Sequence, residues 1–224
     1  MLHYSNTPSP QLFSCAMYPI YLKLTEKPCL VVGGGTVAER KIASLIEEGA
    51  RITVIAPEVT PSIVARAKEK KIETLHKRRY NKGEAKDYFL IIAATGDAET
   101  NKVVSMDAHE AERLVNVVDV PDLCSFYVPA RVTKGNLSIA ISTAGSFPGM
   151  AKKIRKELEP LFPDTYAPLL EVLNNFRCEL KKREPSSKKR MDIYRRIGES
   201  SELQEYLKGN TQPLERLLAQ CRYY

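Results

Sequence analysis

Between residues 29 and 118, short apolar runs alternate with longer amphipathic stretches. The apolar runs are short enough for buried strands, and most of the stretches between them have helical character. The five predicted strands are Cys29–Val32, Arg51–Ala56, Ile72–His76, Tyr88–Ala93 and Leu114–Val118. Strands that alternate with helices are typical of βαβ units. The pattern therefore predicts an α/β fold, with a parallel sheet covered by helices.

The stretch after the first predicted strand shows this helical character in its spacing. Val37, Ile42, Leu45 and Ile46 recur at roughly helical intervals, and Gly49 follows where a left-handed cap would end the helix. We therefore predict a helix between the first two strands.

The pattern changes after Asp119. Phe126–Thr133 and Leu137–Ser142 are strand-like runs, and Lys134-Gly135-Asn136 between them predicts a hairpin turn. From Pro148 onward the sequence is helical almost throughout. The breaks expected in this helical part are Pro160–Asp164, Glu184–Ser187 and Gly209–Pro213.

These changes divide the chain into four predicted parts. Residues 1–16 lack a charged n-region and a continuous apolar h-region, so we interpret them as a flexible extension and not as a signal peptide. Residues 17–120 are predicted to form a Rossmann-type domain. Residues 121–150 form a short β-rich segment that we expect to mediate association, and residues 151–224 form a small helical domain.

Composition narrows the class of protein further. Hydrophobic residues make up 43% and charged residues 27% of the chain, and no run of eighteen apolar residues could span a bilayer, so a membrane protein is not expected. Five dispersed cysteines without a CxxC pair indicate neither a disulfide framework nor a thiolate metal site, which fits a reducing cytoplasm. The three histidines are also too dispersed for metal-ligand spacing, and no metal site is predicted.

The formal net charge of +7 is concentrated in the last third of the chain. From Ala151 onward there are 16 basic and 11 acidic residues, which gives +5 of that total. This excess favours an anionic partner, either nucleic acid or a polycarboxylate ligand, although a solvated helix face is the commoner explanation. The run from Lys181 to Arg190 lacks interleaved aromatic residues and reads as a linker, so no nucleic-acid partner is expected.

The strongest motif is the glycine-rich segment after the first predicted strand. Gly33-Gly34-Gly35-Thr36-Val37-Ala38 matches the pattern G-x-G-x-x-G/A in the context of a strand followed by a helix. In this pattern Gly33 permits the tight turn, Gly35 lets the backbone approach a pyrophosphate, and Ala38 lets helix and strand pack closely. The helix N-terminus then presents N–H groups to the phosphates. Residues 33–38 are thus predicted to bind a dinucleotide; the alternative is a turn with only a packing role.

Two other strand ends supply candidates for the same ligand. The ribose-binding acid is expected about twenty residues beyond the turn, where the second strand runs into Pro57 and Glu58. No Arg follows this strand immediately, which favours NAD over NADP, but Glu58 also suits the first turn of the next helix. Thr95, after the fourth strand, either lines the ligand crevice or caps the helix that follows.

Three further segments accompany the glycine turn in a fixed order. They are MYPIYL (17–22) with VAERK (37–41) beyond the turn, NVVDVPDLCSF (116–126) with Pro129-Ala130, and ISTAGSFP (141–148) with the basic AKKIR (151–155). Together they cover about Met17 to Leu161 and resemble the precorrin-2 dehydrogenase and sirohydrochlorin ferrochelatase family of siroheme biosynthesis. Two departures from the family pattern are Phe147-Pro148 in place of the usual Ser-Pro, and the sixteen residues that precede Met17, which we take as the effective start of the fold.

The resemblance implies NAD-dependent dehydrogenation of precorrin-2 to sirohydrochlorin. Some members of the family also insert ferrous iron, and the sequence does not choose between one activity and two. The resemblance also implies a homodimer built through the region from Phe126 to Ser146 and the helical tail. The family's important carboxylate falls on Asp119, and its Ser-Ser or Ser-Thr pair falls on Ser142 and Thr143.

These residues suggest roles at a site for a reduced tetrapyrrole. Asp119, after the fifth strand, is the candidate catalytic residue, which would accept a proton or stabilise positive charge on the macrocycle; an ordinary turn residue is the alternative. Ser142 and Thr143 either hydrogen-bond a substrate carboxylate or finish a strand and cap a helix. Lys152 and Arg155, together with Lys153 and Lys156, either meet substrate carboxylates or form a solvated helix face.

Overall fold

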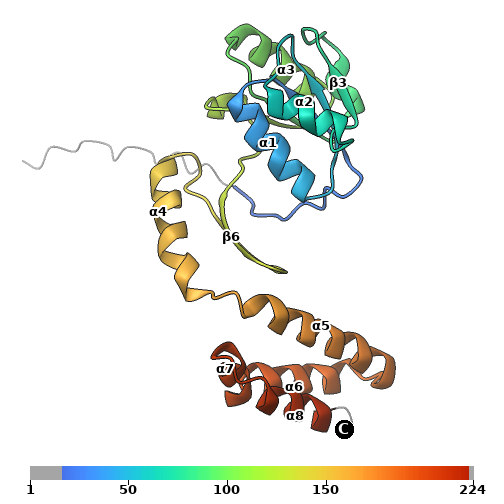
Figure 1. Ribbon diagram of the computed structural model, residues 1–224, viewed down its shortest axis with the longest axis vertical. Helices are drawn as coiled ribbons and strands as arrows, with labels where there is room; N and C mark the ends of the chain where they lie inside the picture. The colour runs from blue at the N-terminus through green and yellow to red at the C-terminus, as the bar shows by residue number, and fades with distance from the viewer. Residues whose placement is uncertain (1–16, 222–224) are drawn as a thin grey trace, which may run out of the picture. The chain divides into compact units, whose positions relative to one another are not determined.

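The computed structural model describes residues 17–221 and leaves the predicted N-terminal extension, residues 1–16, outside the described part (Figure 1). The chain forms two compact units that divide between Val128 and Pro129. Each unit has a hydrophobic core of its own. The finer division into four parts stays a prediction.

The first unit is built on a parallel five-stranded sheet in the order β3-β2-β1-β4-β5. Its strands are β1 (Pro28–Val32), β2 (Arg51–Ile55), β3 (Thr74–His76), β4 (Leu90–Ala93) and β5 (Leu114–Val117). The predicted α/β class is confirmed, and all five predicted strands are present with small changes at their ends. The chain leaves β1 in one direction and returns to pair β4 on its other side, which opens a ligand crevice at the carboxyl end of β1.

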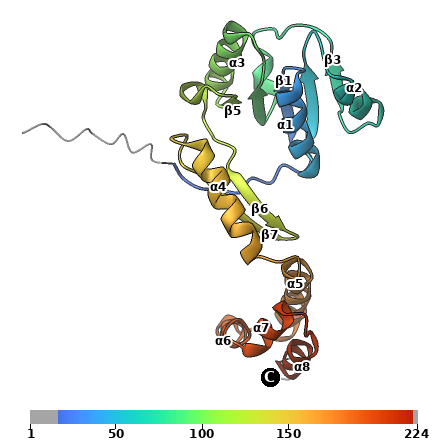
Figure 2. The ribbon, with the colours of Figure 1, turned by 60° about the vertical axis from the view of Figure 1, so that its left-hand side comes forward.

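Both faces of this sheet are covered by helices, because its strands are apolar on both sides. Cys29 and Val31 of β1 share a core with α1 (Thr36–Glu47) and α2 (Pro61–Lys68). Leu30 and Val32 share the opposite core with α3 (Ala98–Glu110) (Figure 2). Successive side chains of a strand point to opposite faces, so one apolar run serves two cores. Two 3₁₀ turns, η1 (Glu84–Asp87) and η2 (Pro121–Leu123), complete this unit.

The second unit begins with an antiparallel hairpin of β6 (Ala130–Lys134) and β7 (Leu137–Ile141). The predicted turn is confirmed: Gly135 has φ +56°, and a Cβ there would lie 2.7 Å from the Cβ of Ala167. The prediction of a strand from Phe126 was wrong for residues 126–129. Pro129 has no N–H to donate to a ladder, and the carbonyl of Phe126 accepts a hydrogen bond from the Asn116 side chain.

Helices make up the rest of the second unit. They are α4 (Pro148–Leu158), the 3₁₀ turn η3 (Glu159–Leu161), α5 (Tyr166–Arg183), α6 (Ser187–Gly198), α7 (Ser201–Leu207) and α8 (Gln212–Cys221). The three predicted breaks are present. A further break between α6 and α7 was not predicted, and there Ser200 caps α7 by accepting a hydrogen bond from the Leu203 N–H. In the part of the chain that the structure describes, no helix has the length and apolar character needed to cross a membrane.

Candidate functional site

The carboxyl ends of four neighbouring strands are joined along one edge of the sheet of the first unit. The Gly33 N–H donates to the Ile55 carbonyl at 3.0 Å, and the Ala94 N–H donates to the Val32 carbonyl at 2.8 Å. The Val118 N–H in turn donates to the Ala93 carbonyl at 2.9 Å. These bonds extend the ladder past the strand ends, and they bring the segments that follow β1, β2, β4 and β5 to a common edge.

The three glycines after β1 have different steric requirements. Gly33 has φ +127°, and a Cβ there would lie 2.3 Å from the Ala94 carbonyl oxygen. A Cβ on Gly34 would lie 1.9 Å from the Glu58 carbonyl oxygen. A Cβ on Gly35, by contrast, would have no heavy atom within 4 Å. The first two glycines are therefore required by the protein's own packing, whereas Gly35 leaves open space on the side where a ligand would approach.

Helix α1 begins at this open space. Its N-cap, Gly35, has no side chain that could cap the first-turn N–H groups, so these groups remain available to an anion. Thr36 and Val37 start the helix, while Ala38 is fully buried in the core shared with β1. The predicted segment thus contains three residues that pack within the protein, Gly33, Gly34 and Ala38, and one, Gly35, that leaves open space for a ligand. Thr36 and Val37 do not line the cavity beside the turn.

A cavity of about 320 Å³ lies in front of this turn. Its lining comes from the ends of β1, β2 and β4 and from the segment after β3. The residues are Val32, Gly33, Gly34, Gly35, Ile55, Ala56, Pro57, Glu58, Arg79, Tyr80, Ala94, Thr95, Gly96, Asp97 and Thr100. The cavity therefore gathers Gly33–Gly35, Pro57, Glu58 and Thr95 of the predicted cofactor residues. A glycine cradle, an uncapped helix start and mainly apolar walls fit a dinucleotide.

Glu58 belongs to this cavity and not to the following helix. Helix α2 starts at Pro61, Thr60 is its N-cap, and its first turn holds no acidic residue. The alternative role of Glu58 as a first-turn acid is therefore wrong. Its side chain is exposed beside the turn, where a carboxylate is able to accept hydrogen bonds from ribose hydroxyls.

Thr95 lines the cavity, but its hydroxyl forms hydrogen bonds within the protein. The hydroxyl lies 2.8 Å from the Asn101 Oδ1 and 3.0 Å from the Asp97 carbonyl. Asp97, and not Thr95, is the N-cap of α3, because its carboxylate accepts a hydrogen bond from the Glu99 N–H. Thr95 therefore shapes the wall of the cavity and offers little free hydrogen-bonding capacity to a ligand.

Asp119 lies after β5 at the same edge, outside the lining of the cavity. It is exposed and has φ +61°, a left-handed conformation that Asp tolerates better than most residues do. The thiol of Cys124 holds the turn: its sulfur accepts a hydrogen bond from the Val117 N–H and lies within hydrogen-bonding distance of the carbonyls of Val117 and Val120, at 3.2 and 3.3 Å. Burial raises the pKa of this thiol, which keeps it protonated as a donor.

Lys41 of α1 brings a positive charge toward this turn. Burial lowers the pKa of its ammonium group, Arg40 lowers it further, and the charge of Asp119 opposes both effects. Lys41 belongs to a segment on which the family resemblance rests, but the sequence did not indicate its position near Asp119. A partly desolvated cation beside an exposed carboxylate makes the neighbourhood of Asp119 polar on a largely apolar sheet edge.

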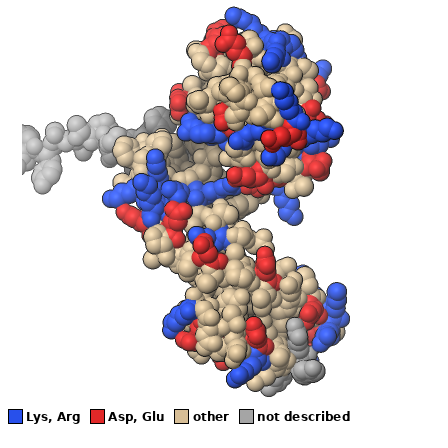
Figure 3. All heavy atoms as spheres, viewed as in Figure 1, with Lys and Arg blue, Asp and Glu red and all other residues tan. Residues whose placement is uncertain are grey.

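The predicted substrate residues belong to the second unit. Ser142 accepts a hydrogen bond from the Ala144 N–H and Thr143 accepts one from the Phe147 N–H, so both hydroxyls order the segment before α4 and retain a proton to donate. Arg155 pairs with Glu159 at 2.8 Å, whereas Lys152 is exposed. Figure 3 shows Lys and Arg side chains gathered over α4, with acidic side chains among them.

The residues that sequence reasoning missed at the cavity are Arg79 and Tyr80. They follow β3, which pairs with β2, and so they reach the same edge of the sheet as Glu58. The prediction that no basic residue is present rested only on the end of the second strand. A signal was present, since carboxyl ends of adjacent parallel strands share an edge. Within residues 17–221, no group of three His, Cys, Asp or Glu side chains is arranged to hold a metal ion.

Two family models match the chain. The model described as "Putative NAD(P)-binding" matches residues 20–130, and the model described as "Sirohaem biosynthesis protein central" matches residues 134–160. The first covers nearly all of the unit that holds the cavity, and the second covers the hairpin turn, β7 and α4.

Curated relatives and a solved structure extend this similarity. "Siroheme synthase" of Methylobacillus flagellatus is 35% identical over 202 residues, which are 90% of this chain and 43% of that protein. "Siroheme synthase" of Pseudoalteromonas translucida is 36% identical over 200 residues, 89% of this chain and 42% of that protein. The chain thus spans about two fifths of the length of these relatives. The structure of "SirC, precorrin-2 dehydrogenase" is 28% identical with a TM-score of 0.78, and the match covers 93% of this chain and 100% of that chain.

Proposed function

The chain belongs to the precorrin-2 dehydrogenase and sirohydrochlorin ferrochelatase family of siroheme biosynthesis, and from this premise we propose that it oxidises precorrin-2 to sirohydrochlorin with NAD. The observation that carries the proposal is the cavity at the glycine turn, with the carboxylate of Asp119 at the same sheet edge. The reaction removes one hydride and one proton from the macrocycle. The protein must therefore orient two ligands and receive a proton.

The residues of the first unit divide this work. When bound, NAD supplies the hydride acceptor. Gly35 and the start of α1 would hold its pyrophosphate, and Glu58 would accept hydrogen bonds from its adenosine ribose. Val32, Ile55 and Ala94 would supply apolar walls around the bound cofactor.

Asp119 is the proposed proton acceptor. The carboxylate is exposed, and Cys124 connects its turn to the end of β5 by hydrogen bonds. The turn is therefore held in place while the carboxylate oxygens stay accessible. A positioned carboxylate is able to take a pyrrole or carbon-bound proton as the hydride leaves. Lys41 contributes an ammonium group whose pKa responds to the charge of Asp119.

The second unit is proposed to bind the acidic periphery of the substrate. Ser142 and Thr143 each have a hydroxyl proton left to donate, since their oxygens already accept backbone N–H groups. Lys152 and Arg155 on α4 offer cationic groups of the kind that pairs with carboxylates. Arg155 already has Glu159 as a partner, so Lys152 is the stronger candidate of the two.

The test is turnover of precorrin-2 with NAD, followed by NADH absorbance and by the spectrum of sirohydrochlorin. We expect the wild-type chain to form both products, and Asp119→Ala to lower kcat by about a hundredfold or more while NADH still binds. Lys208→Ala, which removes an exposed charge on the second unit, is the matched control. A wild-type chain that binds NAD but leaves precorrin-2 unchanged would overturn the proposal.

A second activity, insertion of ferrous iron into sirohydrochlorin, is the alternative that the family resemblance implies. The observation that favours it is again Asp119, an exposed carboxylate able to accept the two displaced pyrrole protons one after the other and release each to water. Iron is then a substrate and not a resident cofactor. Co²⁺ insertion into supplied sirohydrochlorin, measured with wild type and Asp119→Ala, separates the bifunctional enzyme from a dehydrogenase alone.

We also propose that the chain forms a homodimer through the β6–β7 region and works in the cytoplasm. The support for dimerisation is the hairpin itself: α4 contacts both of its strands, yet only Val132 of the ten strand residues is buried. The support for a reducing compartment is that Cys29, Cys124, Cys178 and Cys221 are free thiols. Sedimentation equilibrium tests the dimer. No observation supports a nucleic-acid partner.

A further inference from the structure

Arg79 occupies a defined place in the cavity. It follows β3, which pairs in parallel with β2, and β2 ends at Pro57 and Glu58. The residues after β4 and β5 lie at the other side of the glycine turn, since the sheet order is β3-β2-β1-β4-β5. Arg79 therefore follows the strand next to the one that ends at Glu58, the residue proposed to bind the adenosine ribose, whereas Asp119 follows β5, the outermost strand on the opposite side of the sheet.

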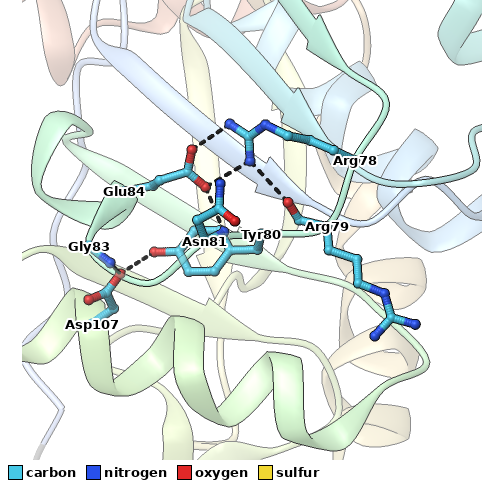
Figure 4. Close-up of polar contacts among 7 residues, drawn as sticks. All are labelled: Arg78, Arg79, Tyr80, Asn81, Gly83, Glu84 and Asp107. Atoms are coloured by element: carbon cyan, nitrogen blue, oxygen red, sulfur yellow. Dashed lines mark hydrogen bonds and ion pairs between the residues drawn. The ribbon is translucent and has the colours of Figure 1, made fainter.

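The backbone on both sides of Arg79 is fixed by side-chain contacts (Figure 4). On one side, the guanidinium of Arg78 donates to the Glu84 carboxylate at 3.0 Å and to the Arg79 carbonyl at 3.0 Å. Glu84 also accepts a hydrogen bond from the Asn81 N–H at 2.8 Å. One ion pair thus ties the start and the end of this loop together and holds the peptide of Arg79 in place.

On the other side, Tyr80 is anchored to the interior. Its hydroxyl donates to the carboxylate of Asp107, a residue of α3 that is only 5% exposed, and the same oxygen accepts the Gly83 N–H at 2.6 Å. Burial and the neighbouring carboxylate raise the pKa of the Tyr80 phenol, so the phenol remains a donor. A buried charge with two donors is costly to disturb, so this anchor is rigid.

The guanidinium of Arg79 itself is left for another partner. Figure 4 shows it extending away from both anchors. Within residues 17–221 it takes part in no hydrogen bond or ion pair, and it does not pair with Glu58. The pKa of Asp97, another residue of the lining, is lowered mainly by the hydrogen bond from the Thr100 hydroxyl. The positive charge of Arg79 is one of the smaller causes of the same shift. The loop therefore presents an unpaired cation to the lining of the cavity from a backbone that is held on both sides.

A carboxylate and a guanidinium beside one ribose have opposite preferences. Glu58 accepts a hydrogen bond from a free 2′-hydroxyl and repels a 2′-phosphate, whereas an arginine accommodates that phosphate. We propose that Arg79 is a specificity-determining residue for the cofactor: it receives the 2′-phosphate of NADP and offsets Glu58, so that the chain binds both NAD and NADP. This inference rests on the dinucleotide site of the proposed function and extends it to a second form of the cofactor.

The experiment is equilibrium titration of the full chain with NADH and with NADPH, followed by nicotinamide fluorescence. Wild type is expected to bind NADPH within about tenfold of NADH, and Arg79→Ala is expected to weaken NADPH by about tenfold while NADH changes little. Glu58→Gln should lower the Kd for NADPH relative to the Kd for NADH. Adding Arg79→Ala to the Glu58→Gln chain should abolish this gain in NADPH affinity. Lys82→Ala, which removes an exposed charge from the same loop, is the matched control and should leave the ratio unchanged.

The titration separates failure of this inference from failure of the proposed function, because precorrin-2 is absent from it. Equal weakening of NADH and NADPH by Arg79→Ala would mean that Arg79 stacks on the adenine, and this overturns the inference alone. So would a wild-type chain that binds NADH and rejects NADPH, or a loss of selectivity in Lys82→Ala as large as that in Arg79→Ala. Binding of neither form would overturn the dinucleotide site and the inference together.

Discussion

The turn after β1 and the turn after β5 lie at the same edge of one sheet, yet they are held in opposite ways. The first turn is held by close backbone contact, with Gly33 and Gly34 against the carbonyls of Ala94 and Glu58. The second turn carries a side chain on a left-handed backbone, Asp119 at φ +61°, and is held by the thiol of Cys124. One turn excludes side chains because its backbone packs closely against two neighbouring segments, while the other displays an exposed carboxylate.

The way in which each turn is held predicts which substitutions it tolerates. A backbone-held turn fails when atoms are added, because a Cβ has no place to go without moving two strands. A turn held by side chains is destabilised when side-chain atoms are removed, because hydrogen bonds are lost. Added atoms disturb it less, because its backbone is not packed closely. The two turns should therefore respond oppositely to larger and smaller residues, and the predictions below follow that contrast.

The largest effect is expected for Gly34→Ala. The added Cβ would lie 1.9 Å from the Glu58 carbonyl oxygen, so the segments after β1 and β2 must separate, at a cost of about 3 kcal/mol in the free energy of unfolding. Urea denaturation followed by circular dichroism measures this loss. The control is Gly96→Ala, at a glycine of the same cavity with no heavy atom near its Cβ position. A Gly34→Ala protein as stable as wild type would break the comparison.

Asp119→Gly should separate the chemistry of the second turn from its structure. Glycine adopts φ +61° without strain, so the free energy of unfolding should stay constant or rise by about 1 kcal/mol. Turnover of precorrin-2 should fall by about a hundredfold or more, because the proton acceptor is gone. Paired denaturation and rate measurements test this, with Asp119→Asn as the variant that keeps the side-chain shape. Retained turnover in both variants would remove Asp119 from the mechanism.

Gly35→Ala should affect the ligand and leave the fold intact. Its Cβ would meet no protein atom within 4 Å and would project into the space proposed for the pyrophosphate. We expect unchanged unfolding in urea and an NADH affinity reduced by about tenfold. Fluorescence titration measures the affinity. If the variant were destabilised as much as Gly34→Ala, the distinction between packing glycines and the ligand-facing glycine would be wrong.

Cys124→Ala should give the smallest change, a loss of about 1 kcal/mol in the free energy of unfolding, because the Val117 N–H loses its acceptor. Cys124→Ser should lose less, since a hydroxyl keeps both a donor and an acceptor. Thermal unfolding of the two variants beside wild type tests the order. An alanine variant more stable than the serine variant would show that the thiol acts by packing and not by hydrogen bonding.

The thiol also predicts a dependence on pH. Burial raises the pKa of Cys124 in the folded chain, so its contribution to stability is complete below the pKa of an unfolded cysteine, about 8.5, and is lost as the pH rises through the folded value. The advantage of wild type over Cys124→Ser should therefore narrow above that pH, because serine does not titrate. Denaturant midpoints measured across the alkaline range test this; a constant difference would contradict it.

Local patterns predicted much of the first unit and less of its site. All five strands of the parallel sheet and the hairpin turn at Gly135 follow from periodicity and turn residues, and the structure contains them. The break at Ser200 was missed because a serine N-cap inside a polar stretch resembles a surface position of one continuous helix. The strand expected from Phe126 was too long because its first carbonyl is bound by Asn116, ten residues earlier.

At the site, the sequence indicated which residues are candidates for binding a dinucleotide, but not which other residues surround them. Pro57, Glu58 and Thr95 were predicted from their place at strand ends and do line one cavity with the glycine turn. Arg79 was missed because its relevance depends on the pairing of β3 with β2 and on anchors at Glu84 and Asp107. The strand pairing and the contact of Tyr80 with Asp107 join residues far apart in the chain, and no spacing rule encodes them.

The sequence by itself determined the alternation of strands and helices, the glycine turn and the family, because these depend on periodicity and on short motifs whose geometry is local. Only the tertiary structure decided that position 34 must be glycine because the Glu58 carbonyl lies against it. The same holds for the place of Glu58 in the cavity and not in α2, and for the hydrogen bonds by which Cys124 holds the turn of Asp119. The physical reason is that each of these depends on which strands lie side by side, and strand order is set by burial of the whole sheet between its helices.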